Sequence, residues 1–222
     1  MSQPSAGKTK PAPAYLRRPA QQGISLLETM IAMVLGLAVL AGVLKFMGVL
    51  TESNTTLLKV TRLEQDLRTV MDIMLQDMRR ANQYPQAVSD LGQPARFIQH
   101  QPTPPQIDGQ PFASGQSGSQ ISYAYQEADG KLISGRFSHD AKAGTVLMHT
   151  GTASAPETIT DPAFMQVTAL RFQAEQATVK AGAIHLSIPS VEITLIGQIK
   201  GSPEMERTLV DRVTWRNPVV SP

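Results

Sequence analysis

The segment from Ile24 to Leu44 constrains this chain more than any other feature. It holds 21 residues and a single charged side chain, Glu28. At 1.5 Å per residue, a helix of this length spans roughly 32 Å, which matches the hydrocarbon core of a bilayer. The sequence therefore predicts one membrane-spanning helix near the N-terminus, followed by Lys45, whose ammonium group can reach the far interface.

Residues 1–23 carry four cations and no acidic residue, and they lack hydrophobic periodicity. Positive charge before a span favours a cytoplasmic N-terminus, so the part after the span is expected on the opposite side of the membrane. The rest of the chain has 16 basic and 18 acidic residues, which gives it a net charge of −2. The basicity therefore belongs to the tail, and no nucleic-acid partner is expected.

Glu28 is the residue that a plain membrane anchor leaves unexplained. A carboxylate within a membrane span costs roughly 2.5 kcal/mol or more, so it predicts a partner or a functional role. A second alternative is a secretory signal peptide cut after Ala41, which would release a soluble periplasmic protein beginning at Gly42. That alternative explains neither Glu28 nor the helical pattern that continues past the cut.

The stretch Gly23-Ile24-Ser25-Leu26-Leu27-Glu28, followed by an apolar helix, resembles the prepilin leader motif of type IV pilins and pseudopilins. Ile24 stands where this family usually carries Phe. The resemblance implies that prepilin peptidase removes leader 1–23 by cutting between Gly23 and Ile24, and then N-methylates Ile24. It also implies that Glu28 binds the free amine of a neighbouring subunit during assembly, which makes 24–45 a transmembrane and polymerisation helix.

Residues 46–82 continue the helix with an amphipathic pattern. One face carries apolar residues spaced by three or four positions, namely Val60, Leu63, Leu67, Val70, Met71, Met74 and Met78. The other face carries the i,i+4 pairs Glu64–Arg68 and Arg68–Asp72. No proline occurs between positions 24 and 84, so one helix of roughly 88 Å is predicted from Ile24 to Asn82. The methionine stripe is interpreted as core packing and not as a cofactor groove.

The C-terminal part changes to another pattern. Residues 83–120 contain six prolines, nine glutamines and four glycines, which predicts a linker or loop. From 121 to 222 the apolar residues alternate, and Asp129-Gly130 favours a type I′ hairpin. The expected strands are 121–126, 131–137, 145–149, 166–176, 183–189, 191–199 and 206–215. They predict one antiparallel sheet of about five to seven strands.

Two further stretches carry the resemblance beyond the N-terminus. The helix segment "LEQDLRTVMDIMLQDMRRANQY" resembles the corresponding segment of the PilW group of minor pilins and of pseudopilin J. The C-terminal "RTLVDRVTWRN" resembles the end of PilW-type chains. The implied fold is α+β and pilin-like, with a long N-terminal helix whose amphipathic half packs on a C-terminal antiparallel sheet.

The residues offer no constellation for catalysis. The chain has no cysteine, and His100, His139, His149 and His185 lack the spacing of a metal site. We interpret His139-Asp140 as part of a turn, His185 as a solvent-facing strand residue, and the glycine-rich 114–120 as a loop. Trp215 is interpreted as a core anchor or a sheet-edge residue. The sequence therefore predicts no enzyme, no cofactor and no metal.

The resemblance implies a minor pilin that helps to initiate type IV pilus assembly. It also implies a single-pass protein of the bacterial inner membrane, with its C-terminal domain in the periplasm, that then enters a pilus or pseudopilus. Its partners would be prepilin peptidase, other minor pilins, the major pilin and an inner-membrane assembly platform, in a filament or a priming complex. A type II secretion pseudopilin of the J type remains an alternative, as does a pilus-tip adhesin or a DNA-capturing pilin. The balance of −2 and an aromatic content of 5% argue against the last two.

Overall fold

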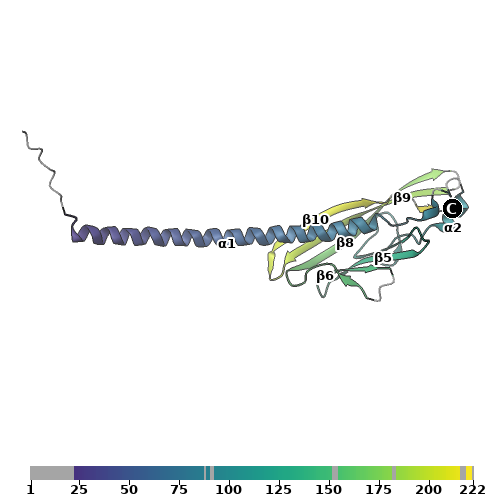
Figure 1. Ribbon diagram of the computed structural model, residues 1–222. Helices are drawn as coiled ribbons and strands as arrows, with labels where there is room; N and C mark the ends of the chain where they lie inside the picture. The colour runs from purple at the N-terminus through teal and green to yellow at the C-terminus, as the bar shows by residue number, and fades with distance from the viewer. Residues whose placement is uncertain are drawn as a thin grey trace, which may run out of the picture. The chain divides into compact units, whose positions relative to one another are not determined.

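The computed structural model describes residues 23–87, 89–90, 93–151, 155–181, 184–215 and 219–221, so most of the basic leader lies outside it. The chain divides into two units, Met1–Glu52 and Ser53–Pro222. Helix α1 (Leu26–Met78) begins in the first unit and ends in the second (Figure 1). The expected α+β layout, a long N-terminal helix with antiparallel sheets, is confirmed.

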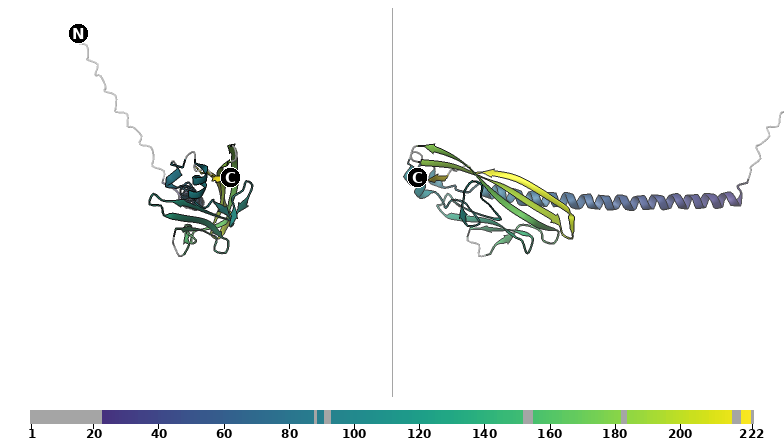
Figure 2. Two further views of the ribbon diagram at one scale, coloured as in Figure 1. Left: turned by 90° about the vertical axis from the view of Figure 1, so that its right-hand side faces the viewer. Right: turned by 180° about the vertical axis from the view of Figure 1, so that it is seen from behind.

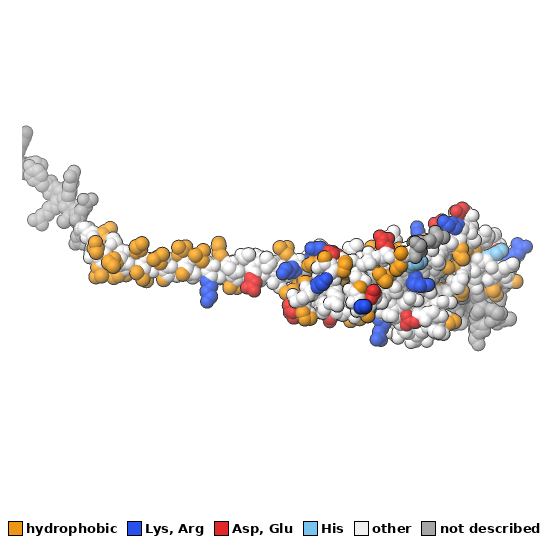
Figure 3. All heavy atoms as spheres, turned by 90° about the horizontal axis from the view of Figure 1, so that it is seen from below, with side chains coloured by type: hydrophobic (Ala, Val, Ile, Leu, Met, Phe, Trp, Pro, Cys, Tyr) orange, Lys and Arg blue, Asp and Glu red, His pale blue; other side chains and the backbone are white. Residues whose placement is uncertain are grey.

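The part of α1 in the first unit is exposed at every position. Its apolar residues lie all round the helix and not on one stripe, which is typical of a helix meant for lipid or for other helices. Figure 3 shows hydrophobic side chains covering this stretch. Among the described residues, α1 is the one helix that is long and apolar enough to cross a membrane.

Helix α1 is shorter than the predicted Ile24–Asn82, because it begins at Leu26 and ends at Met78. Asn82 adopts a left-handed conformation with φ 61°, which asparagine tolerates better than most residues. Its N–H donates to the carbonyl of Ala124 at 2.8 Å, and Gln126 donates to the carbonyl of Gln83 at 2.7 Å. These two hydrogen bonds join the chain just after α1 to strand β4 (Gln120–Gln126).

The first sheet has six strands in the order β2-β1-β4-β5-β6-β7, all antiparallel to their neighbours. Their bounds are Gln110–Pro111 (β2), Gln106–Ile107 (β1), Gln120–Gln126 (β4), Leu132–Asp140 (β5), Thr145–Thr150 (β6) and Glu157–Thr158 (β7). Strands β4, β5 and β6 coincide with predicted strands.

The second sheet has five strands, in the order β10-β9-β8-β3, with β11 also bonded to β9. Their bounds are Ser202–Thr214 (β10), Ile184–Ile199 (β9), Met165–Ala181 (β8), Ser117–Gly118 (β3) and Val219–Ser221 (β11). The prediction of a single sheet is wrong, because alternation marks strands but not their partners. Strand β9 also continues through Pro189, where the alternation suggested two separate strands.

The segment 83–120 is not the irregular linker that its prolines suggested. It contains a 3-10 turn (Pro85–Ala87), helix α2 (Pro94–His100) and the short strands β1, β2 and β3. Strand β1 bonds to β4 and β3 bonds to β8, so this segment contributes strands to both sheets. Strands of two residues carry no periodic signal, which is why the sequence did not reveal them.

The hairpin between β4 and β5 lies where it was predicted but with another turn. Gly130 has φ 85° and donates its N–H to the carbonyl of Glu127 at 2.9 Å, whereas Asp129 does not adopt a positive φ. A type I′ turn needs positive φ at both central residues. The loop is instead a turn closed by a single left-handed glycine.

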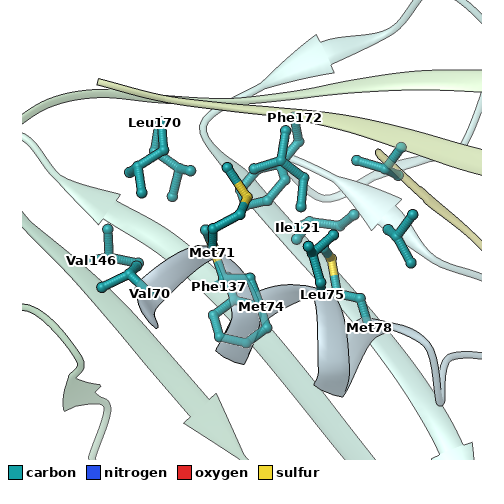
Figure 4. Packing of buried hydrophobic residues seen from close by; sticks show 14 of the residues in the cluster. Val70, Met71, Met74, Leu75, Met78, Ile121, Phe137, Val146, Leu170 and Phe172 are labelled. Carbon is teal, nitrogen blue, oxygen red and sulfur yellow. The ribbon is translucent and has the colours of Figure 1, made fainter. Parts of the chain in front are cut away.

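The hydrophobic core of the second unit forms where α1 lies against both sheets (Figure 2). The helix buries Leu63, Leu67, Val70, Met71, Met74, Leu75 and Met78. Figure 4 shows the last five of these side chains, from Val70 to Met78, beside residues of both sheets. The labelled neighbours are Ile121, Phe137 and Val146 of the first sheet and Leu170 and Phe172 of the second. The methionine stripe is therefore core packing, as predicted.

Candidate functional site

The residues of the predicted processing site lie at the start of α1. Gly23, Ile24 and Ser25 are exposed and precede the helix without regular structure. The helix begins at Leu26 because the carbonyl of Ser25 accepts the N–H of Thr29 at 3.2 Å, the first helical hydrogen bond. The Gly23–Ile24 bond therefore lies outside the helix, and the Ile24 residue is 75% exposed.

Glu28 lies in the first turn of α1, three residues after Ser25. This spacing of serine and glutamate around a helix start is that of a capping box. A carboxylate in the first turn also interacts favourably with the helix dipole, by about 0.3–1 kcal/mol where it is exposed. The position of Glu28 in the first turn was not predicted, although the Ser-x-x-Glu spacing is visible in the sequence.

Glu28 is exposed and forms no ion pair with any residue from Gly23 onwards that the structure describes. It is also the one charged residue between Ile24 and Leu44. Its carboxylate is therefore available to a group from outside the described part of the chain. Buried among lipid tails or other helices, it would require such a group.

The apolar side chains around Glu28 form a large exposed surface. Leu26 is 79% exposed, Met33 is 70% exposed, and the other large apolar residues up to Leu50 are all at least 45% exposed. Soluble monomers rarely expose contiguous apolar surface beyond a few hundred Å². This stretch of helix therefore needs a lipid or protein environment.

Small residues interrupt this apolar surface at regular intervals. Ala32 and Gly36 are four residues apart, as are Ala38 and Gly42. A Cβ atom added at either glycine would meet nothing within 4 Å. Pairs of small residues at this spacing let two membrane helices approach closely, so each pair marks a place on α1 where a neighbouring helix can approach.

Comparison with known proteins adds a decisive observation. Residues 56–215 match the family model described as prepilin peptidase-dependent protein B, which covers most of the sheet domain and the buried half of α1. The chain belongs to this family. Residues 18–44 also match the prokaryotic N-terminal methylation motif. No curated protein and no solved structure matches the chain.

These two matches confirm a type IV pilin-like protein. Gly23, Ile24 and Glu28 all lie inside the methylation motif, whereas the prepilin peptidase-dependent protein B match begins at residue 56. The family is one of structural, pilin-like proteins. The N-terminal apolar helix of this member is compatible with single-pass anchoring in a membrane.

The remaining candidate residues have structural roles in this prepilin peptidase-dependent protein. His139 and Asp140 end strand β5, and Asp140 Oδ1 accepts backbone N–H groups of the turn that follows, so the prediction of a turn holds for Asp140. His139 Nε2 lies 3.0 Å from the carbonyl oxygen of Val167. Trp215 is buried, as predicted, and its ring centroid lies 5.1 Å from that of Phe112. The side chain of His185 lies outside the described residues.

The other two histidines and the glycine-rich stretch also lie in the Ser53–Pro222 unit. His100 Nδ1 lies 2.7 Å from a carboxylate oxygen of the buried Asp90, and His149 lies opposite Arg136 in the first sheet. Within 114–120, Ser117 and Gly118 form strand β3, where only a loop was predicted. Among the described side chains, no group of three histidines or carboxylates is placed to hold a metal ion.

Proposed function

We propose that this chain is a minor pilin of the PilW type, which helps to initiate type IV pilus assembly. One observation supports this most directly. The chain combines an N-terminal methylation motif with an exposed apolar stretch, 24–44, whose single charge is Glu28. Such a helix suits lipid first and the packed helices of a filament afterwards.

Processing is the first step of this proposal. Prepilin peptidase removes residues 1–23 and N-methylates the new terminus at Ile24. The exposed, non-helical Gly23–Ile24 bond supports this assignment, since a peptidase needs a bond that can enter its active site in an extended form. The cut leaves Ser25 and Glu28 in place, so the start of α1 keeps its capping spacing.

Assembly is the second step. In lipid, the carboxylate of Glu28 lacks a cation and is costly. The terminal amine of a neighbouring subunit supplies that cation when two helices pack side by side, and the resulting buried ion pair fixes their register. Assembly is thereby favoured over the membrane pool. The small residues of α1 permit the close approach that this contact needs.

The sheet domain gives this proposed subunit its shape-specific surface. It lies in the periplasm, where it contacts other minor pilins and the major pilin, while the assembly platform in the inner membrane acts on the helix. The protein works by association and performs no chemistry of its own. The cytoplasmic N-terminus of the precursor follows from the four cations before the span.

The first experiment is the intact mass and N-terminal sequence of the protein extracted from membranes. A methylated Ile24 terminus is expected, and Gly23→Ala is expected to leave the precursor uncut. A terminus at Gly42, or an uncut wild-type chain, would contradict the proposal. Affinity capture of the processed protein should recover pilins, whereas recovery of secretion-system components alone would assign it to the type II machine.

Two substitutions separate the charge of Glu28 from its capping role. Glu28→Gln keeps the capping-box spacing but removes the charge, since glutamine also serves at this position. Glu28→Ala removes both. We expect both variants to be cleaved normally and both to fail in assembly, measured by recovery with other pilins. Normal assembly of Glu28→Gln would show that the charge is not needed.

A further inference from the structure

Strand β10 forms one edge of the second sheet. It pairs with β9 at Ser202 and then, after an irregularity, from Glu206 to Thr214, and its other side bonds to no strand in the described part of the chain. An unpaired edge presents a row of free N–H and C=O groups, which can template the pairing of another strand. This edge runs for 13 residues.

The charges along β10 have a self-complementary order. Before Leu209 an acidic residue, Glu206, is followed by a basic one, Arg207. After Leu209 the same order recurs in Asp211 and Arg212. When two copies pair antiparallel around Leu209, Arg207 lies opposite Asp211 and Glu206 lies opposite Arg212. Each pair then occurs twice. Opposite charges facing each other across strands are stabilising, and like charges are not.

Other registers lose this match. Moving the centre of pairing to Thr208 leaves Arg207 opposite Leu209, and moving it to Val210 leaves Arg207 opposite Val213. A slip of one residue along the strand, which places the centre between two residues, would bring side chains of opposite faces across from each other. The order of charges therefore selects the register centred on Leu209.

The two inner charges of this pattern are available to a partner. Arg207 donates to the neighbouring carbonyl of Glu206 at 2.8 Å, and Asp211 accepts the N–H of Arg212 at 2.7 Å. Neither side chain forms an ion pair with another described residue, and both are exposed. Arg212, by contrast, already lies 2.9 Å from Glu175 and 3.3 Å from Glu192. The Arg207–Asp211 pairs would therefore contribute most of the selectivity.

The edge of β10 also borders a hollow of about 250 Å³ beside α1. Its walls are Arg68, Met71 and Asp72 of the helix and Leu209, Val210 and Asp211 of the strand. Val210 is 57% exposed, and Leu209 is half-buried against the core. A strand added at this edge would cover Val210 and lie along the open side of the hollow.

We propose that two copies of this chain pair through β10, antiparallel and centred on Leu209, so that their second sheets join into one. The contact is isologous, because each copy offers the same strand, and two-fold symmetry closes it at a dimer. It uses residues of the Ser53–Pro222 unit and does not depend on the proposed processing or on Glu28. A homodimer is thus distinct from any contact between the apolar helices.

Single cysteines test this pairing in the full-length protein, since the chain contains none. In the proposed dimer, the two cysteines of Leu209→Cys would lie opposite each other on the symmetry axis. Opposite Cα atoms of paired antiparallel strands are about 4.5–5.5 Å apart, which falls within the roughly 4.4–6.8 Å Cα separation that a disulfide needs. Mild oxidation in detergent is expected to yield a covalent dimer on a non-reducing gel. Failure to cross-link would overturn the proposal.

Two exposed positions provide the matched control. In the proposed register, position 208 of one copy lies opposite position 210 of the other. A mixture of the Thr208→Cys and Val210→Cys variants should therefore cross-link. Each variant alone should cross-link at least tenfold more slowly. This test stands even where Leu209→Cys destabilises the fold. Leu57→Cys, on exposed α1, reports association through the helix. Cross-linking at Leu57 alone, or equal rates in all samples, would contradict strand pairing.

Charge exchange tests the register itself. Arg207→Asp places two acids opposite each other in a homodimer, and Asp211→Arg places two cations opposite each other. We expect either substitution to reduce the cross-linking of Leu209→Cys at least tenfold. A mixture of the two charge variants restores complementary pairs and should recover cross-linking between unlike chains. If the variants cross-link like the parent, the charge pattern does not govern association.

Discussion

Leu67 of α1 lies so close to Gly197 of β9 that a Cβ atom added at Gly197 would be 2.8 Å from Leu67 Cδ2. Leu67 is fully buried and belongs to the central core cluster, so its side chain has no space to withdraw. The helix therefore approaches the second sheet at a point where the strand carries no side chain.

Gly197→Ala should lower the free energy of unfolding by about 1–3 kcal/mol, because it forces extra volume into a packed core. The measurement is denaturant unfolding of the detergent-solubilised chain, followed by the fluorescence of its single tryptophan. Leu67→Ala should remove the clash, so the double variant should be less destabilised than the sum of the two single changes. Strict additivity would contradict this contact.

Tyr123→Phe should cost about 1.5–3 kcal/mol, the range for a hydrogen bond to a charged group. The Tyr123 hydroxyl donates to the carboxylate of Asp77, whose side chain is only 12% exposed. Burial, with the charge of Asp77, raises the pKa of Tyr123 well above its usual range. Tyr125→Phe is the matched control, since its hydroxyl meets the exposed Arg80 at 3.3 Å. Equal losses of stability would argue against a special role for Tyr123.

Stability should fall at alkaline pH in a way that depends on Tyr84. Burial chiefly, and then the charge of Asp90, raise the pKa of Tyr84 from 10.0 to about 12. The folded state therefore holds this proton more tightly than the unfolded state. Tyr84 therefore contributes its full share of stability at pH values below its pKa in the unfolded chain. This share is lost as the pH rises through its pKa in the folded protein.

Melting temperatures measured from about pH 8.5 to about pH 11.5 test this dependence. In Tyr84→Phe the decline should be shallower than in the wild type. A residual decline is expected, because the pKa of Tyr123 is raised in the same direction. Identical slopes in the two proteins would show that Tyr84 does not contribute to the alkaline loss.

Met74→Ala should destabilise the sheet domain by about 2–5 kcal/mol, because Met74 is fully buried between α1 and the sheets. Met47→Ala, at a residue that is 61% exposed, should change the unfolding of that domain by less than about 0.5 kcal/mol. The same denaturant titration measures both. A similar loss in the two variants would mean that the core does not depend on the methionine stripe.

The sequence predicted what is encoded locally. The buried face of α1 follows from a spacing of three or four residues, and most long strands follow from alternation. The prepilin motif was readable because Gly23, Ile24 and Glu28 are close in the chain, and its match to residues 18–44 agrees with that interpretation.

Contacts between distant segments were not predictable in this way. The division into two sheets depends on which strands bond, and the approach of Leu67 to Gly197 depends on how α1 lies against β9. The short strands β1 and β3 become strands only because β4 and β8 offer them partners. The charge order of β10 is visible in the sequence, but it acquires meaning only once β10 is known to be an edge.

The packing of α1 against both sheets has a consequence for the order of folding. The helix occurs early in the chain, whereas β8, β9 and β10, which form most of the second sheet, occur late. Contacts across such separations must overcome a large loss of chain entropy before they stabilise anything, so domains built from them fold slowly. The sheet domain therefore cannot complete its core until nearly the whole chain has emerged. Until then, the apolar face of α1 from Leu63 to Met78 remains exposed to other proteins in its compartment.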